Sequence, residues 1–214
     1  MDVELSAEQE EFRKIVRAFA EEVVAPRAEA MDREARLDPA VLDQMAGMGL
    51  FGLPFPEEVG GMGADYTTLC LAIEELARVD SSVAITLEAA VGLGAMPIWR
   101  YGTADQHQQW LRPLATGERL AAFGLTEPGG GSDAGALTTR AVQDGQEWVI
   151  DGTKAFITNA GLDRSVFEEA VRAESLTAAL DRLVELVDRH AGGRHDDDLA
   201  LLGLEYDPGA GNRG

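Results

Sequence analysis

The sequence predicts an α+β protein: an N-terminal all-α bundle, then a truncated β-barrel or meander, then a helix–strand tail. Up to about residue 120, apolar residues recur at helical spacing, and polar capping residues separate the repeats. Beyond that point, short alternating runs are separated by Asp-Gly pairs, as is typical of antiparallel strands. We therefore divide the chain into three predicted segments, residues 1–120, 121–161 and 162–214.

The first predicted helix begins at Ser6, which is followed three positions later by Gln9 in the pattern of a capping box. Apolar residues from Phe12 to Phe19 recur on one face of this helix. Pro26 lies inside the same pattern. Because proline donates no backbone hydrogen bond, we expect a kink or a change of helix there.

Each later helix of the bundle is predicted to begin at a residue whose short side chain accepts hydrogen bonds from first-turn amides. These N-cap residues are Asp38, Asp65, Asp80 and Thr103. The stretch 83–101 carries little charge and is apolar on nearly all sides, so we expect it to lie inside the bundle.

A glycine-rich stretch, Leu125–Asp133, follows a short apolar run and contains three consecutive glycines. Without Cβ atoms, these residues let the backbone turn sharply and approach a ligand. Thr126 and Ser132 add hydroxyls that donate or accept hydrogen bonds. The stretch is either a ligand-contacting loop or a plain surface loop. It is not a phosphate loop, because it lacks both Gly-Lys-Ser/Thr and a strand–GxGxxG–helix arrangement.

The residues after this stretch alternate as strands do. Val149-Ile150 and Ala155–Thr158 flank Asp151-Gly152, which predicts a hairpin with an Asp-Gly turn. Asp144-Gly145 indicates an earlier turn of the same meander.

Composition limits the partners and the compartment. A formal net charge of −20 over 214 residues argues against nucleic acid or an anionic membrane surface as a partner, because both attract basic surfaces. The single cysteine, Cys70, excludes an internal disulfide, and its apolar neighbours predict a buried thiol. No signal peptide and no run of about 18 apolar residues is evident, so we expect a cytoplasmic protein without a membrane span.

Two short motifs carry a family resemblance: Leu-Thr-Glu-Pro-Gly-Gly-Gly-Ser-Asp at 125–133 and Phe-Ile-Thr-Asn-Ala-Gly at 156–161. Their joint occurrence at this spacing resembles the flavin-binding region of the acyl-CoA dehydrogenases. Residues 5–161 resemble the N-terminal helical domain and the start of the middle β-domain of that family. The resemblance implies FAD as the cofactor, α,β-dehydrogenation of an acyl-CoA as the reaction, and a homo-oligomer or pairing with a related dehydrogenase.

The resemblance also implies which residues contact the cofactor. Thr126 would hydrogen-bond the flavin ring, and Thr158 would bond near its reactive edge. Ser132 matches the pyrophosphate side and also a contact to the CoA arm of the substrate. Phe156 stands where a tryptophan is common and still offers an aromatic face. The full set of candidates is Phe123, Leu125, Thr126, Gly131, Ser132, Phe156, Ile157 and Thr158.

The catalytic base of that family is a glutamate in a C-terminal helical bundle that has no counterpart in this sequence. We therefore expect no catalytic residue here, and we interpret Glu127 as a brace of the glycine-rich stretch. The predicted function is that of a truncated dehydrogenase; the alternative is a non-catalytic remnant or module that pairs with a full-length dehydrogenase. The glycine loop Glu57–Gly63 is either a plain turn or, as the resemblance suggests, part of the lining of the acyl pocket. The stretch 83–101 is either a core helix or a border of the same pocket.

After residue 161 the pattern changes to a helix followed by an apolar strand. This tail resembles the C-terminal end of bacterial metal-dependent serine/threonine phosphatases of the sporulation-regulator type, through Asp197–Leu202. The resemblance implies that the chain is a fusion of fragments and that Asp197 is a metal ligand. The alternative is a charged turn before a strand, because one carboxylate without acidic partners holds a divalent ion weakly.

Overall fold

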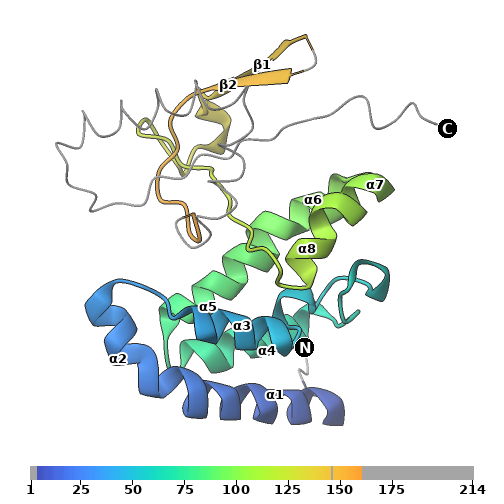
Figure 1. Cartoon of the computed structure of the whole chain (residues 1–214), viewed down its shortest axis with the longest axis vertical. Helices are drawn as coiled ribbons and strands as arrows, with labels where there is room; N and C mark the ends of the chain where they lie inside the picture. Colours follow the sequence, from blue (N-terminus) through green and yellow to red (C-terminus); the bar gives the residue numbers. More distant parts are fainter. Residues whose placement is uncertain (1–3, 146, 161–214) are drawn as a thin grey trace. The chain divides into compact units, whose positions relative to one another are not determined.

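The computed structural model describes residues 4–145 and 147–160 of the chain (Figure 1). The chain divides into two compact units, Met1–Phe123 and Gly124–Gly214. The first is mostly helical, and the described part of the second carries a small antiparallel sheet. The predicted helix–strand tail at 162–214 and its Asp197 lie outside the described residues.

Helix α1 (Ala7–Phe19) begins with the predicted capping box. The Ser6 hydroxyl accepts from the Gln9 amide at 3.1 Å, and the Gln9 side chain accepts from the Ser6 amide at 3.0 Å. A π-helical turn, η1 (Ala20–Val24), joins α1 to α2 (Ala25–Glu34). The predicted change of helix at Pro26 is confirmed, since this proline lies in the first turn of α2, where its missing N–H is not needed.

The predicted caps of the next helices are also confirmed. The Asp38 carboxylate accepts from the Ala40 amide at the start of α3 (Pro39–Gly47). The Asp65 carboxylate accepts from the Thr68 amide at the start of α4 (Tyr66–Ala77). Each aspartate satisfies an amide that has no partner inside its helix.

The glycine loop, Glu57–Gly63, begins with the second of two 3-10 turns and leads to α4. These turns are η2 (Leu50–Gly52) and η3 (Glu57–Val59). The loop folds back on the preceding segment, with the Gly63 amide donating to the Phe55 carbonyl at 2.7 Å. A Cβ on Gly61 would overlap that same carbonyl, so the close approach of the two backbones requires glycine.

The apolar stretch forms one continuous helical run. It consists of α5 (Ser81–Glu88), the π-helical η4 (Ala89–Ala95) and α6 (Met96–Tyr101), and Asp80 caps its start. This run is long and apolar enough to cross a membrane by length and composition alone, a test that core helices also pass. Val83, Leu87 and Val91 are buried, as the core prediction requires.

The bundle ends with three short helical pieces. These are α7 (Ala104–Gln106), the π-helical η5 (His107–Leu111) and α8 (Arg112–Ala115). Thr103 and Gln106 form the capping box of α7.

The core of the first unit is apolar and draws on every long helix. Helix α4 packs against both α1 and α5. The fully buried apolar side chains are Val16, Val24, Val41, Met45, Leu50, Leu53, Phe55, Leu76, Val83, Leu87 and Leu111. Cys70 on α4 is exposed, so the prediction of a buried thiol was wrong; it lies on the face of α4 that does not join this core.

The described part of the second unit contains a short 3-10 turn, η6 (Ala134–Ala136), and a hairpin of β1 (Arg140–Asp144) and β2 (Glu147–Asp151). The strands pair antiparallel, with Arg140 opposite Asp151 and Asp144 opposite Glu147. The hairpin is visible in Figure 1.

One of the two predicted turns is confirmed and the other is wrong. Asp144-Gly145 turns as expected, with Gly145 in the left-handed region at φ 64°, whereas Asp151-Gly152 does not form the expected hairpin turn. Gly152 is instead held against Thr139, and a Cβ at Gly152 would overlap the Thr139 side chain. Residues 155–158 do not form the predicted strand, because Phe156 has a φ of 55°, which breaks an extended run.

Candidate cofactor site

The two segments predicted to contact a flavin lie side by side in the second unit. The Ala155 amide donates to the Thr126 carbonyl at 2.8 Å. Next to it, the Lys154 ammonium donates to the Leu125 carbonyl at 2.9 Å. The residues directly before the second segment are therefore fixed against the start of the first.

The glycine-rich stretch makes a tight turn directly after Thr126. The Glu127 and Gly130 backbones exchange two hydrogen bonds, each 3.0 Å long. A Cβ at Gly129 or Gly130 would meet no described atom within 4 Å, and neither glycine has a left-handed φ. Since the described fold does not require glycine at these two positions, the stretch leaves open backbone of the kind a ligand can approach.

Thr126 offers donor groups beside this open backbone. Its side chain is half-buried, and its hydroxyl would lie 3.0 Å from a Cβ at Gly131. Among the described residues, neither the amide nor the hydroxyl of Thr126 has a hydrogen-bond partner. Backbone and hydroxyl donors seldom stay without a partner, so these groups can bond water or a ligand.

The other predicted cofactor residues are less closely joined. Ile157 is buried, Thr158 is half-buried and Ser132 is exposed. Phe156 is 81% exposed, and Phe123, also exposed, is the last residue of the first unit. Within the part of the chain that the structure describes, no hydrogen bond joins Ser132 or Thr158 to Thr126.

Glu127 is a buried charged residue in the described part of this unit, and its carboxylate accepts four hydrogen bonds. The Thr138 amide and hydroxyl donate at 2.7 and 2.6 Å, the Thr139 amide at 2.9 Å, and the Lys154 ammonium at 2.9 Å. These bonds from Thr138, Thr139 and Lys154 hold the pKa of the carboxyl well below its usual range, so Glu127 is anionic.

The interpretation of Glu127 as a brace agrees with these contacts, but its partners were not foreseen. Lys154 is only 20% exposed, which is low for a lysine. It was overlooked because it lies between the two predicted segments; a lone lysine two residues before the Phe-Ile-Thr motif was the available signal.

Comparison with known families supplies the deciding observation. Residues 6–118 match the model of the acyl-CoA dehydrogenase N-terminal domain, and residues 122–206 match that of the middle domain. The chain belongs to the acyl-CoA dehydrogenase family. The second match continues past residue 162, where a join between fragments was predicted.

Individual relatives agree. The chain is 43% identical over 175 residues to a probable acyl-CoA dehydrogenase, YngJ, of Bacillus subtilis (strain 168), a match that covers 82% of this chain and 46% of the relative. The butyryl-CoA dehydrogenase structure from Megasphaera elsdenii is 41% identical with a TM-score of 0.71, covering 75% of this chain and 43% of that one. An acyl-CoA dehydrogenase from Bacillus anthracis, solved in complex with FAD, is 37% identical with a TM-score of 0.66, covering 73% and 27%. The matched region thus spans less than half of each relative.

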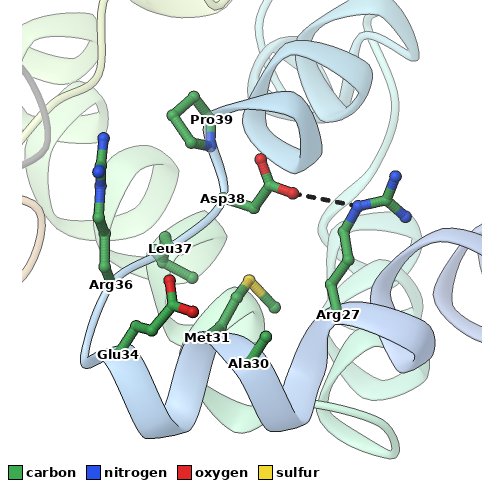
Figure 2. A pocket seen from close by; sticks show the side chains of 8 residues that line it. All are labelled: Arg27, Ala30, Met31, Glu34, Arg36, Leu37, Asp38 and Pro39. Atoms are coloured by element: carbon green, nitrogen blue, oxygen red, sulfur yellow. Dashed lines mark hydrogen bonds and ion pairs between the residues drawn. The ribbon is translucent and has the colours of Figure 1, made fainter.

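The Bacillus anthracis enzyme was solved in complex with FAD, and FAD is the cofactor that membership of this family implies. The helical unit of this acyl-CoA dehydrogenase family member has an open pocket of ≈ 260 Å³ beside α2 and the start of α3 (Figure 2). An ion pair between Arg27 and Asp38, 3.1 Å long, lies at this pocket. None of the predicted cofactor residues lines this pocket.

No cluster that could hold a metal ion occurs among the described residues. The candidate metal ligand, Asp197, lies outside them and stays a prediction.

Proposed function

We propose that this chain provides the N-terminal part of an FAD-dependent acyl-CoA dehydrogenase, with the flavin held against the Thr126 segment. The observation that supports this most directly is the hydrogen bond between Ala155 and the Thr126 carbonyl, which joins the two predicted flavin segments beside an open glycine turn. The reaction would be α,β-dehydrogenation of an acyl-CoA thioester.

The residues present suit the cofactor. A flavin ring presents carbonyl and ring-nitrogen acceptors, and Thr126 has an amide and a hydroxyl to donate. Gly131 and Ser132 would lie on the pyrophosphate side, where a backbone without Cβ atoms admits phosphate oxygens. When bound, FAD supplies the two-electron acceptor for the hydrogen removed from the β-carbon. Ile157 would exclude water beneath the ring, because its side chain is already buried.

We nominate no catalytic base. Glu127 is unsuitable because its carboxylate is nearly fully buried and accepts from four donors, which weaken it as a base and keep it from reaching a substrate. The α-proton would be taken by a glutamate of the C-terminal bundle that the family contains. Ser132 would contact the CoA arm of the substrate.

Flavin titration of the purified full chain tests the proposal. We expect the chain to bind FAD and to show flavin absorption at roughly 450 nm. Thr126→Val should bind FAD with a several-fold larger dissociation constant. Thr153→Val is the matched control, because Thr153 is an exposed threonine of the same unit outside the predicted contacts. Failure of the wild-type chain to bind FAD, or equal binding by both variants, would contradict this site.

The same sample separates the two functional candidates. Butyryl-CoA is the probe, since one matched structure is a butyryl-CoA dehydrogenase. Anaerobic bleaching of the flavin indicates a working enzyme; a stable yellow colour indicates the alternative, a cofactor-binding module that pairs with a full-length dehydrogenase. Manganese-dependent phosphate release would instead support the phosphatase-like tail and Asp197.

A further inference from the structure

A buried ion pair lies beside the Thr126 segment. Glu127 is 6% exposed, and Lys154 donates to its carboxylate at 2.9 Å. Through Thr138 and Thr139, the same carboxylate holds the segment that leads into β1. One pair of side chains therefore joins the 125–127, 138–139 and 154–155 segments.

Lys154 also fixes the direction of one particular peptide group. Its ammonium donates to the Leu125 carbonyl at 2.9 Å, and that oxygen belongs to the same peptide unit as the Thr126 amide. In a planar trans peptide the C=O and N–H bonds point in opposite directions. A lysine that holds the Leu125 oxygen therefore turns the Thr126 N–H away from itself.

The next peptide unit is held in the same way. Its carbonyl, on Thr126, accepts from Ala155 at 2.8 Å, and its amide, on Glu127, donates to Gly130 at 3.0 Å. The Thr126 amide thus belongs to one fixed peptide group and is followed directly by another, and it has no partner of its own among the described residues. Such a donor is oriented before any ligand arrives, which lowers the ordering cost of binding.

We propose that Glu127 and Lys154 are a positioning pair that aims the Thr126 amide at the flavin ring. This rests on the proposed function of the same segment. The pair carries no net charge, so it orients the amide without adding a charge beside the flavin. It acts through the backbone and does not touch the cofactor.

The test compares the wild-type 214-residue chain with Lys154→Met, which removes both hydrogen bonds that the ammonium donates and keeps an aliphatic side chain. We expect about tenfold weaker FAD binding and, at saturating FAD, an altered visible circular dichroism spectrum of the bound flavin. Glu127→Gln should change the FAD affinity and the circular dichroism spectrum of the bound flavin in the same direction. Arg140→Met is the matched control, an exposed cation of the same unit that should change neither. An unchanged dissociation constant and flavin spectrum in Lys154→Met would overturn the proposal.

A second measurement separates this idea from the proposed function and from misfolding. In the flavin-free protein, the amide resonance of Thr126 should move in Lys154→Met and much less in Arg140→Met. Lys154→Arg, which keeps a donor, should recover part of the wild-type shift. If the wild type takes up no FAD, the proposed function fails while this resonance still reports on the pair. If Lys154→Met does not fold, the other two variants still test the proposal. A Thr126 amide resonance and an FAD dissociation constant equal to wild type in both Lys154→Arg and Glu127→Gln would overturn the positioning role of this pair.

Discussion

Glu75 is a carboxylate with no exposed side-chain area in a helix whose sequence is otherwise apolar on several faces. Its oxygens accept from Arg13 at 2.8 Å, from Arg17 at 2.7 and 2.8 Å, and from Arg78 at 2.9 Å. The hydrogen bonds from Arg17, against the cost of burial, lower the pKa of Glu75 to about 2. The group therefore ties α1 to α4 only while it is ionised.

Glu75→Gln should lower the free energy of unfolding by about 2 kcal/mol at pH 7, because three arginines lose their charged acceptor. Glu75 has a lower pKa in the folded state than its ordinary 4.5. Its contribution is therefore complete above pH 4.5 and is lost as the pH falls toward 2. Urea unfolding of both proteins at pH 7, 5, 4 and 3 should show the difference between them shrinking with acid.

Glu11→Gln is the control for that prediction. Its carboxylate pairs with Lys14 at 3.1 Å, but both side chains are about two-thirds exposed. Such a pair contributes little. A difference between wild type and Glu75→Gln that stays constant from pH 7 to 3 would show that the charge of Glu75 is not what joins the helices.

At the scale of elements, the loop between η3 and α4 depends on the small size of one residue. Gly61→Ala places a Cβ against the Phe55 and Gly52 backbones, neither of which can rotate away. We expect a loss of about 1–3 kcal/mol, as for other overpacked sites. Gly47→Ala is the matched control, since a Cβ there meets nothing within 4 Å and the helix favours alanine. Chemical denaturation should separate the two, and equal stability would show that the loop relaxes.

Local signals predicted the helix starts well. Ser6, Asp38 and Asp80 cap their helices because an N-cap needs only a short acceptor and the next two or three amides. The turns were predicted only in part: Asp144-Gly145 turns as expected, but Asp151-Gly152 does not form the expected hairpin turn. Packing explains the difference, because a Cβ at Gly152 would overlap the Thr139 side chain.

The candidate site was predictable only in part. Motif likeness selected Thr126 and Gly131, which the structure places next to one another. Lys154 was not selected, because its importance comes from a backbone carbonyl 29 residues away and a carboxylate 27 residues away in sequence. Glu75 was missed for the same reason: three partners on two helices satisfy it, and no single helix pattern shows them.

At the scale of the whole molecule, the two units hold their buried charges in separate networks. Glu75 is bonded within α1 and α4, whereas Glu127 is bonded to residues 138, 139 and 154. No partner is shared, so substitutions in the two networks should have additive effects on stability. The proposed flavin contacts near Thr126 and the helical core can then be perturbed one at a time.

FAD should therefore stabilise the unit that binds it, and Glu75→Gln should not weaken that effect. A ligand at 100 times its dissociation constant adds about 2.7 kcal/mol if only the folded state binds it. Hydrogen exchange read peptide by peptide should show protection by FAD around 125–132 and 154–158, and faster exchange in α1 and α4 of Glu75→Gln. The FAD dissociation constant of Glu75→Gln should stay within about twofold of wild type, since its flavin-facing segments are intact. A tenfold weakening, equal to that expected for Lys154→Met, would mean that the helical unit sets the flavin affinity and that the two networks are coupled.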